Sequence, residues 1–234
     1  RGEPLHIVLR VEAAVGNLRK RFMYAALRWA TIAVAMRELH DAEDGAFRII
    51  HVSIQRNHVH LIVEADNKVA LWRGMKSFQI SAAKHINREF SRNLETRRRG
   101  KVFTDRYHEE IITTPKQARH TLAYVLNNWR KHREDRGDVQ RAWKVDPYST
   151  GWHFTGWKER EHERFMWRHR DTYDPLVVYL PKTWLLREEG SDTRRQLAAW
   201  WHRQRLAPKR TMTFDSPDAI KRAVMPDIAF PATP

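Results

Sequence analysis

The sequence contains no cysteine among its 234 residues. This absence excludes disulfide bonds, thiolate nucleophiles and zinc sites built on cysteine. The chain also lacks any apolar run near the roughly 20 residues that a membrane-spanning helix needs. Its first residues lead directly into a strand-like pattern rather than into the basic and apolar regions of a signal peptide. Together these absences favour a soluble intracellular protein.

Acidic residues are scarce relative to basic ones. The chain has 28 Asp and Glu against 43 Lys and Arg, which gives a formal net charge of +15 at pH 7. A charge of this size favours a polyanionic partner such as nucleic acid. Hydrophobic residues make up 41% of the chain, which is enough for a buried core. The length suits one domain with an appendage or two small domains.

The spacing of apolar residues predicts seven elements in the order β-α-β-β-α-β-α. Alternation at period two marks strands, and a period of 3.6 residues marks helices. The predicted strands are 5–11, 47–54, 58–64 and 102–112, and the predicted helices are 18–40, 68–90 and 115–133. The first six elements predict an α+β protein of the ferredoxin-like (βαββαβ) type, an antiparallel four-stranded sheet with two helices on one face. In that topology the first and third strands are central, and the third helix is additional.

The third predicted strand carries a histidine pair, His58 and His60. Residues two apart leave a strand on the same face, so the two imidazoles lie side by side. Such a pair can share one metal ion. The alternative is two ordinary, half-exposed strand histidines, because so short a motif also arises by chance.

The third predicted helix offers a nucleophile and a further ligand. Its apolar stripe consists of Leu122, Val125, Leu126 and Trp129. Tyr124 lies about 150° from the centre of that stripe, which disfavours the alternative of a core tyrosine. Asn128 follows one helical turn later on the same face. The amide oxygen of Asn128 can complete a metal shell with the histidines, and the tyrosine oxygen can attack a phosphate that the metal polarises.

Three ordered blocks of this chain resemble the IS200/IS605-type single-tyrosine (Y1) transposases of the HUH superfamily, and most closely their REP-associated relatives. The blocks are residues 58–64, 100–108 and 124–128, and the resemblance extends over about residues 5–133. It implies a divalent cation, Mg²⁺ or Mn²⁺, at His58 and His60, with Asn128 as polar metal ligand and Tyr124 as nucleophile. The implied reaction is a transposition-like cleavage and rejoining of single-stranded DNA. It proceeds by transesterification through a covalent 5′-phosphotyrosine link and releases a 3′-OH.

The resemblance also implies partners and a location. The substrate would be hairpin-bearing single-stranded DNA, with palindromic repeats near the gene as a candidate source. The protein would act as a monomer or homodimer and would have no membrane partner. The location would be the bacterial cytoplasm, at the nucleoid. Basic residues near the three blocks are candidates for contacts with the DNA backbone, although for each arginine the alternative is an ordinary solvated charge. These residues are Lys84, Arg88, Arg97, Arg98, Arg99, Lys101, Arg130, Lys131 and Arg133.

The composition changes towards the C-terminus, where tryptophan and tyrosine are interspersed with lysine and arginine. We therefore predict a catalytic domain over 1–145 and, after a turn-rich linker, an aromatic-rich extension over 146–234. The aromatic rings of the extension either stack on bases or pack as a cover against the catalytic domain.

Two other functions compete with a DNA strand transferase. One is a non-catalytic ferredoxin-like module that binds single-stranded nucleic acid, as RRM domains do. The third predicted strand, however, lacks the aromatic, glycine-containing motif of an RRM. The other is a relaxase or replication-initiator nuclease of the same superfamily. Many of those proteins carry a helicase domain, which 234 residues do not accommodate.

Overall fold

Four strands form one antiparallel sheet in the computed structural model. The structure describes residues 2–40, 45–94, 97–131, 144–157 and 173–187, together with Glu159, His162 and Phe165. The strands are β1 (Leu5–Arg10), β2 (Phe47–Ile54), β3 (His58–Ala65) and β4 (His108–Ile111). They lie in the order β2-β3-β1-β4, so β1 and β3 are central. Together with the intervening helices, this order is that of the ferredoxin-like fold, and the predicted fold class is confirmed.

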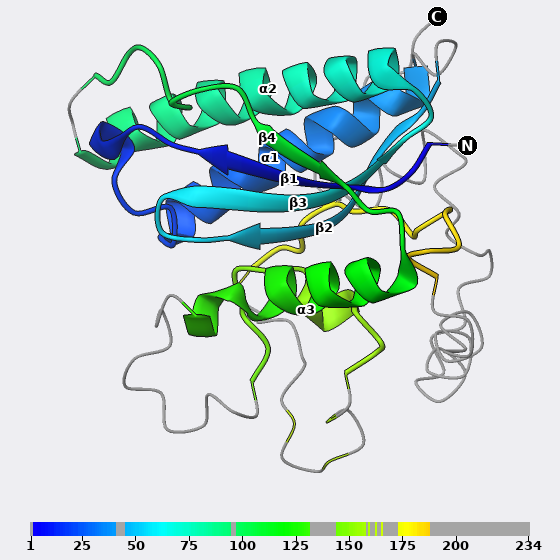
Figure 1. Ribbon diagram of the computed structural model, residues 1–234. Coiled ribbons are helices and arrows are strands. Elements are labelled where there is room, and N and C mark those ends of the chain that lie inside the picture. Colours follow the sequence, from blue (N-terminus) through cyan, green and yellow to red (C-terminus); the bar gives the residue numbers. More distant parts are fainter. Residues whose placement is uncertain are drawn as a thin grey trace, which may run out of the picture.

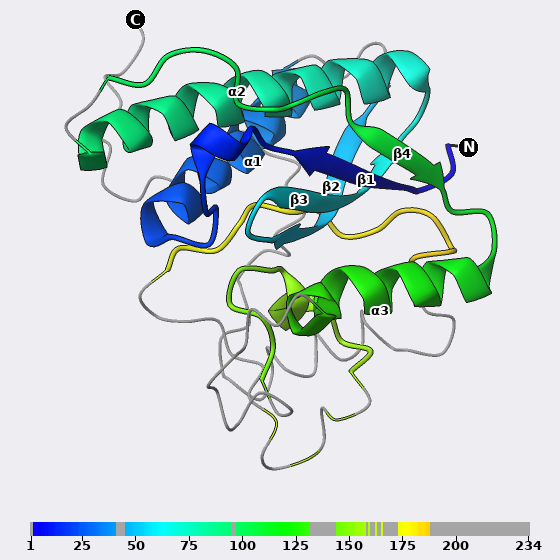
Figure 2. The same ribbon diagram turned by 60° about the vertical axis from the view of Figure 1, so that its left-hand side comes forward.

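Three long helices accompany the sheet: α1 (Arg21–His40), α2 (Lys68–Leu94) and α3 (Pro115–Lys131). Two single 3₁₀ turns are also present, η1 (Ala13–Val15) and η4 (Gly151–His153). Figure 1 and Figure 2 show α1 and α2 together on one face of the sheet and α3 on the other. Within the ranges given above, no helix is long and apolar enough to cross a membrane.

The alternation of residues along β3 determines which side chains face which helix layer. Val59, Leu61 and Val63 belong to the large core beneath α1 and α2. Ile62 belongs to the smaller core on the α3 side, and His60 contacts α3 as well. One face of β3 is therefore fully apolar, and the other face carries the histidine pair together with Ile62 and the buried Glu64.

The fourth strand is shorter than the sequence predicts. Alternation over 102–112 predicts one continuous strand, but regular pairing with β1 covers only His108–Ile111. Val8 pairs with His108, whereas Val11 bridges Phe103. Between these two pairs the chain advances three residues on the β1 side and five residues on the β4 side. The two surplus residues cannot stay in a ladder and loop outwards. Phe103 nevertheless remains buried in the core beneath α1 and α2.

The segment that follows α3 packs onto the sheet. In residues 144–157, the buried carboxylate of Asp146 accepts two hydrogen bonds from the Arg19 guanidinium, at 2.9 and 2.8 Å. The backbone N–H of Thr150 donates to the Val52 carbonyl at 2.9 Å. This segment therefore covers the outer edge of the sheet along β2.

Residues 173–187 also join the fold. The Tyr179 N–H donates to the Ile49 carbonyl at 2.8 Å, Leu176 enters the core beneath α1 and α2, and Leu185 enters the core on the α3 side. The described part of the predicted extension thus buries apolar side chains against both faces of the sheet. Most of 146–234 lies outside the described residues, and the predicted boundary after residue 145 stays a prediction.

One buried carboxylate anchors this C-terminal segment, and its removal is expected to destabilise the fold. Glu64 is fully buried on β3 and accepts hydrogen bonds from the backbone N–H groups of Lys182 and Thr183, from the Thr183 hydroxyl and from Arg48. Glu64→Ala leaves the buried Arg48 with only the half-exposed Asp66 carboxylate, at 3.2 Å, and leaves the Lys182 and Thr183 N–H groups without their acceptor. We expect a loss of about 3–5 kcal/mol in the free energy of unfolding. Urea unfolding followed by tryptophan fluorescence measures it.

Asp174→Asn serves as the control for Glu64. The Asp174 side chain is 77% exposed and lies 3.8 Å from Arg28, so its replacement is expected to cost less than about 1 kcal/mol. Equal unfolding midpoints for the two variants would show that Glu64 does not anchor the segment.

Candidate active site between β3 and α3

The two histidines of β3 meet at their Nε2 atoms. His60 is 2% exposed and His58 is half-buried, and the two Nε2 atoms lie 2.9 Å apart. Asn57 holds the other side of the outer ring, because its Oδ1 lies 2.8 Å from His58 Nδ1. Alternation along the strand brings the rings to one face, as the sequence predicts, and the end of the strand leaves His58 nearer to solvent.

Asn128 on α3 reaches the same point. Its side chain is 1% exposed, and its Nδ2 lies 2.6 Å from His60 Nε2. The Oδ1 atom is buried and has no hydrogen-bond partner among the described residues. A buried amide oxygen without a partner is costly. Rotation of the amide by half a turn directs this oxygen towards the two imidazole nitrogens.

These donors fit a divalent cation. Two imidazole nitrogens and one amide oxygen form a mixed nitrogen–oxygen donor set of a kind that divalent cations use, with water to complete the shell. Across the described ranges, no cluster of three His, Cys, Asp or Glu side chains is arranged to hold a metal ion. Any cation here would therefore depend on His58, His60 and the Asn128 amide together.

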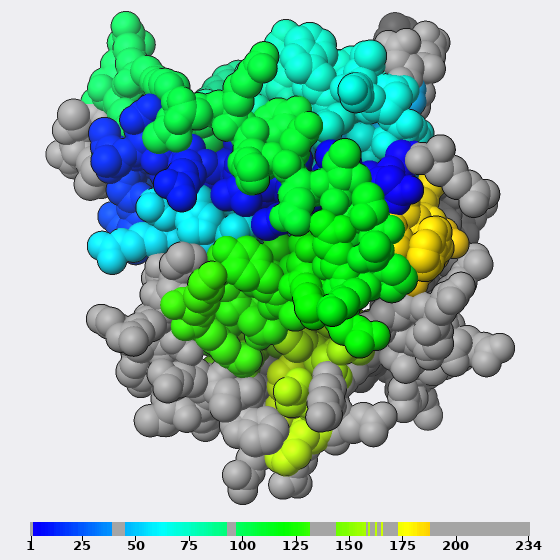
Figure 3. All heavy atoms as spheres, in the orientation of Figure 1, coloured from blue at the N-terminus to red at the C-terminus, as the bar shows by residue number. Residues whose placement is uncertain are grey.

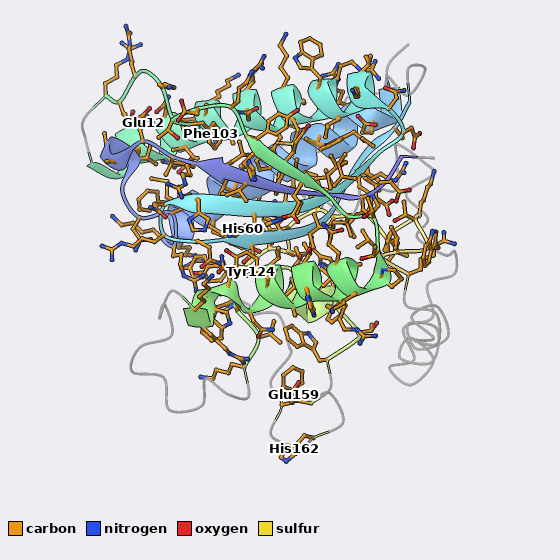
Figure 4. The ribbon with its side chains drawn as sticks, in the orientation of Figure 1. Glu12, His60, Phe103, Tyr124, Glu159 and His162 are labelled. Atoms are coloured by element: carbon orange, nitrogen blue, oxygen red, sulfur yellow. The ribbon has the colours of Figure 1, made fainter. Side chains whose placement is uncertain are left out.

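Tyr124 lies one helical turn before Asn128 and beside the same histidine. Its ring centre is 5.5 Å from that of His60, with an edge-to-face geometry of 83°. Figure 4 shows His60 and Tyr124 facing one another across the gap between β3 and α3. Tyr124 is 39% exposed, whereas the apolar stripe of α3 is buried. In the space-filling view α3 lies at the molecular surface (Figure 3), so a large substrate can approach this helix.

His6 is a member of this cluster that the sequence analysis missed. It lies on β1, is 8% exposed, and its Nε2 is 3.0 Å from His60 Nδ1. Burial lowers the pKa of His6, and the nearby Glu110 carboxylate opposes that shift. A signal was available in the sequence, because His6 alternates with apolar residues on a strand predicted to neighbour the histidine strand.

The predicted DNA contacts divide between the two faces of the sheet. Lys84 and Arg88 lie on α2, on the opposite side of the sheet from α3 (Figure 1). Arg130 and Lys131 end α3, and the Lys131 Nζ lies 4.9 Å from the Tyr124 ring centre. Arg133 lies outside the described residues. The structure thus brings only part of the predicted basic set near Tyr124.

The predicted basic loop leads from α2 back towards β1. Arg97 and Arg99 are exposed. Arg98 donates to the Asn87 side chain and to the Lys101 carbonyl, and Lys101 donates to the Thr104 carbonyl. Two of the four cations therefore tie the loop down, and the other two are directed to solvent.

Comparison with solved structures finds transposases. A structure of the REP-associated tyrosine transposase bound to a REP hairpin is 23% identical, covers 64% of this chain and 77% of its own, and has a TM-score of 0.38. A structure of a predicted transposase from Deinococcus radiodurans is 12% identical, covers 58% of this chain and 92% of its own, and has a TM-score of 0.36. The comparison with curated proteins gave no significant match.

A family profile gives a firmer assignment. The profile described as "Transposase IS200 like" matches residues 6–128. This match begins at His6, includes both histidines of β3 and ends at Asn128. Since it spans more than half of the 234 residues, the chain belongs to the family of IS200-like transposases.

Proposed function

We propose that this protein cleaves and rejoins single-stranded DNA through Tyr124, with a divalent cation held by His58, His60 and Asn128. One observation carries the proposal. Three metal-type donors and a solvent-accessible phenol converge between β3 and α3, with Asn128 Nδ2 only 2.6 Å from His60 Nε2. Membership of a transposase family supports the same reaction class.

Tyr124 supplies the bond-making atom in this proposal. Its Oη attacks the phosphorus of a phosphodiester, an O–P bond to the tyrosine forms, and the bond from phosphorus to the 3′ oxygen breaks. The phenolic proton is lost, and the departing 3′ oxygen takes up a proton to become a 3′-OH. Attack by a 3′-OH on the phosphotyrosine reverses these changes and rejoins a strand. The number of phosphodiester bonds is conserved, so no outside energy source is required.

The protein's own residues orient the reacting groups. Asn128 and His60 bring α3 and β3 together, which holds the Tyr124 ring against the imidazole of His60. When bound, Mg²⁺ or Mn²⁺ would polarise a phosphate oxygen and offset the charge that develops there. Fixing the nucleophile beside this position reduces the entropy lost on reaching the transition state.

Hairpin-bearing DNA is the substrate class that we favour. The REP-associated relative was solved with a REP hairpin. In this chain a net charge of +15 and Lys131 above the Tyr124 ring suit a polyanionic strand at this face. Arg97 and Arg99 add two exposed cations on the loop that packs against α2. Palindromic repeats near the gene are the natural candidates to test.

A labelled strand tests the proposal directly. The protein is mixed with hairpin-bearing single-stranded DNA and Mg²⁺ or Mn²⁺, and the products are separated on a denaturing gel. A strand labelled at its 3′ end should give a slow protein-linked band, whereas the same strand labelled at its 5′ end should give a shorter free product. Binding without any protein-linked band would instead favour the non-catalytic nucleic-acid-binding module.

The exposed arginines of the loop are expected to contribute to DNA binding. Replacing Arg97 and Arg99 together by alanine removes two cations without touching the bonds made by Arg98. The slope of log K against log salt concentration should flatten by up to about 1.4, since each lost contact with single-stranded DNA contributes about 0.7. Binding is measured without divalent cation, so that no cleavage occurs.

A matched pair on α2 calibrates this experiment. Replacing Lys84 and Arg88 by alanine also removes two cations, but Arg88 already donates to the Glu89 carboxylate at 3.3 Å, so part of this charge is compensated within the protein. We expect a smaller change in slope from that pair. A slope like that of the wild type in the Arg97 and Arg99 variant would assign both arginines to ordinary solvated charges.

A further inference from the structure

We propose that His6 is a positioning residue, whose imidazole fixes the ring of His60 so that the His60 Nε2 atom points towards Asn128 and His58. This inference rests on the proposed function, because it concerns the same ligand and the same nucleophile. It adds a residue from a third element, β1, which neither touches the proposed cation nor attacks the DNA.

The geometry of the two central strands brings the rings together. His60 is paired with Val8 and His6 with Ile62, so the two histidines are diagonal neighbours on one face of the sheet. Their ring centres are 5.2 Å apart with planes 19° from parallel, and His6 Nε2 lies 3.0 Å from His60 Nδ1. Both rings are buried, which restricts them to this arrangement.

This bond determines which nitrogen of His60 carries the hydrogen. A neutral imidazole has one protonated and one unprotonated nitrogen, and only the unprotonated one binds a cation. Nε2 is the atom that lies next to both His58 and Asn128, so Nδ1 must carry the hydrogen. A buried N–H needs an acceptor, and His6 Nε2 is that acceptor at 3.0 Å.

The opposite side of His6 is oriented as well. With Nε2 accepting, its Nδ1 carries the hydrogen and faces the Glu110 carboxylate, whose Oε2 is 4.0 Å away. Glu110 is the direct partner of His6 across β1 and β4, and Gln117 of α3 donates to Glu110 Oε1 at 3.0 Å. The distance of 4.0 Å exceeds a hydrogen bond, so Glu110 acts through charge.

His6 also contacts the nucleophile. Its ring centre lies 6.0 Å from that of Tyr124, edge-on at 77°. The same imidazole thus contacts both His60 on β3 and Tyr124 on α3, and it fixes their relative position although it lies on a third element, β1. Small displacements matter here, since a shift of about 1 Å in a reacting group costs about 10²-fold in rate.

Two substitutions separate the hydrogen bond from the packing. His6→Gln keeps an acceptor at the reach of the imidazole Nε2, and His6→Phe keeps a ring of similar shape without an acceptor. Mn²⁺ affinity is measured from the electron paramagnetic resonance signal of the free ion. We expect His6→Phe to bind Mn²⁺ about 10- to 100-fold more weakly than wild type. His6→Gln should retain most of the affinity.

A buried histidine elsewhere in the sheet serves as the control. His51 on β2 bonds the Thr150 hydroxyl at 3.1 Å and contacts Phe154 rather than the candidate site. His51→Phe should bind Mn²⁺ with the affinity of the wild type. A cooperative thermal unfolding transition shows that each variant is folded when its affinity is measured. Wild-type affinity in His6→Phe overturns the inference, and so does an equal loss in His6→Phe and His6→Gln.

The position of the His60 proton distinguishes a positioning role of His6 from a purely structural one, because packing alone does not determine the tautomer. Long-range ¹H–¹⁵N spectra distinguish the two imidazole tautomers, and His60 should carry its hydrogen on Nδ1 in the wild type without metal. His60 protonated on Nε2 overturns the inference even if His6→Phe fails to fold. Covalent adduct formation is measured in parallel. If the wild type and His6→Phe form the adduct at the same rate, only this inference is overturned. If the wild type forms no adduct, the proposed function is overturned.

Discussion

Tyr124→Phe is expected to abolish the covalent protein–DNA adduct while DNA binding persists. The substitution removes one oxygen from a ring that is held edge-on against His60 and is 39% exposed, so packing changes little. Without Oη no bond to phosphorus can form. We expect adduct formation to fall below detection, a loss on the order of 10³-fold or more. The labelled-strand gel measures the adduct, and fluorescence anisotropy with the same hairpin measures binding.

Tyr107→Phe is the matched control for this experiment. Tyr107 is a half-buried tyrosine that packs against the core beneath α1 and α2, on the far side of the sheet. Its variant should form the adduct at the wild-type rate. Full adduct formation by Tyr124→Phe would mean that another group is the nucleophile, and the proposed role of α3 would then be wrong.

His60→Ala is expected to cause the second-largest effect, because it removes the ligand that touches every other member of the cluster. His6, His58 and Asn128 all lie within 3.0 Å of a His60 nitrogen. A divalent cation contributes several kcal/mol of charge stabilisation in phosphoryl chemistry. We therefore expect adduct formation to fall on the order of 10²- to 10³-fold. Mn²⁺ binding should weaken in parallel, and a chelator should suppress adduct formation by the wild type.

Stability distinguishes a ligand from a core histidine. His60→Ala leaves buried polar atoms of His6 and Asn128 without their partner, so it should also cost about 1–3 kcal/mol in the free energy of unfolding. His58→Ala should reduce adduct formation similarly but destabilise less, because His58 is half-buried. If His60→Ala loses stability but forms the adduct at the wild-type rate, His58 and His60 are ordinary strand histidines rather than metal ligands.

The elements of the fold were predictable because each depends on local periodicity. β2 occupies Phe47–Ile54 as predicted, and α2 buries the predicted stripe of Leu71, Met75 and Phe78. Alternation and helical spacing reflect which side of an element is buried, and that information is contained in a short window of sequence. The end of α2, at Leu94 instead of residue 90, was less predictable because helix ends depend on few residues.

The candidate site was predictable in part for a similar reason. His58 and His60 share a strand face, and Tyr124 and Asn128 share a helix face. Each relation follows from spacing within one element. The structure brings the two pairs together between β3 and α3. The predicted topology placed β1 beside β3, but His6 escaped notice because its role depends on the register between these strands, which spacing along one strand does not contain.

The sequence by itself determined the element order, the face of each element that is buried, and the residue types that can hold a cation and attack a phosphate. Only the tertiary structure decided that His6 bonds His60, that Lys84 and Arg88 lie across the sheet from Tyr124, and that Glu64 anchors residues 173–187. The physical reason is the range of the interactions. Periodicity is a property of neighbours in the chain, whereas strand register, helix placement and buried ion pairs join residues far apart in sequence, and these form only when the whole core closes.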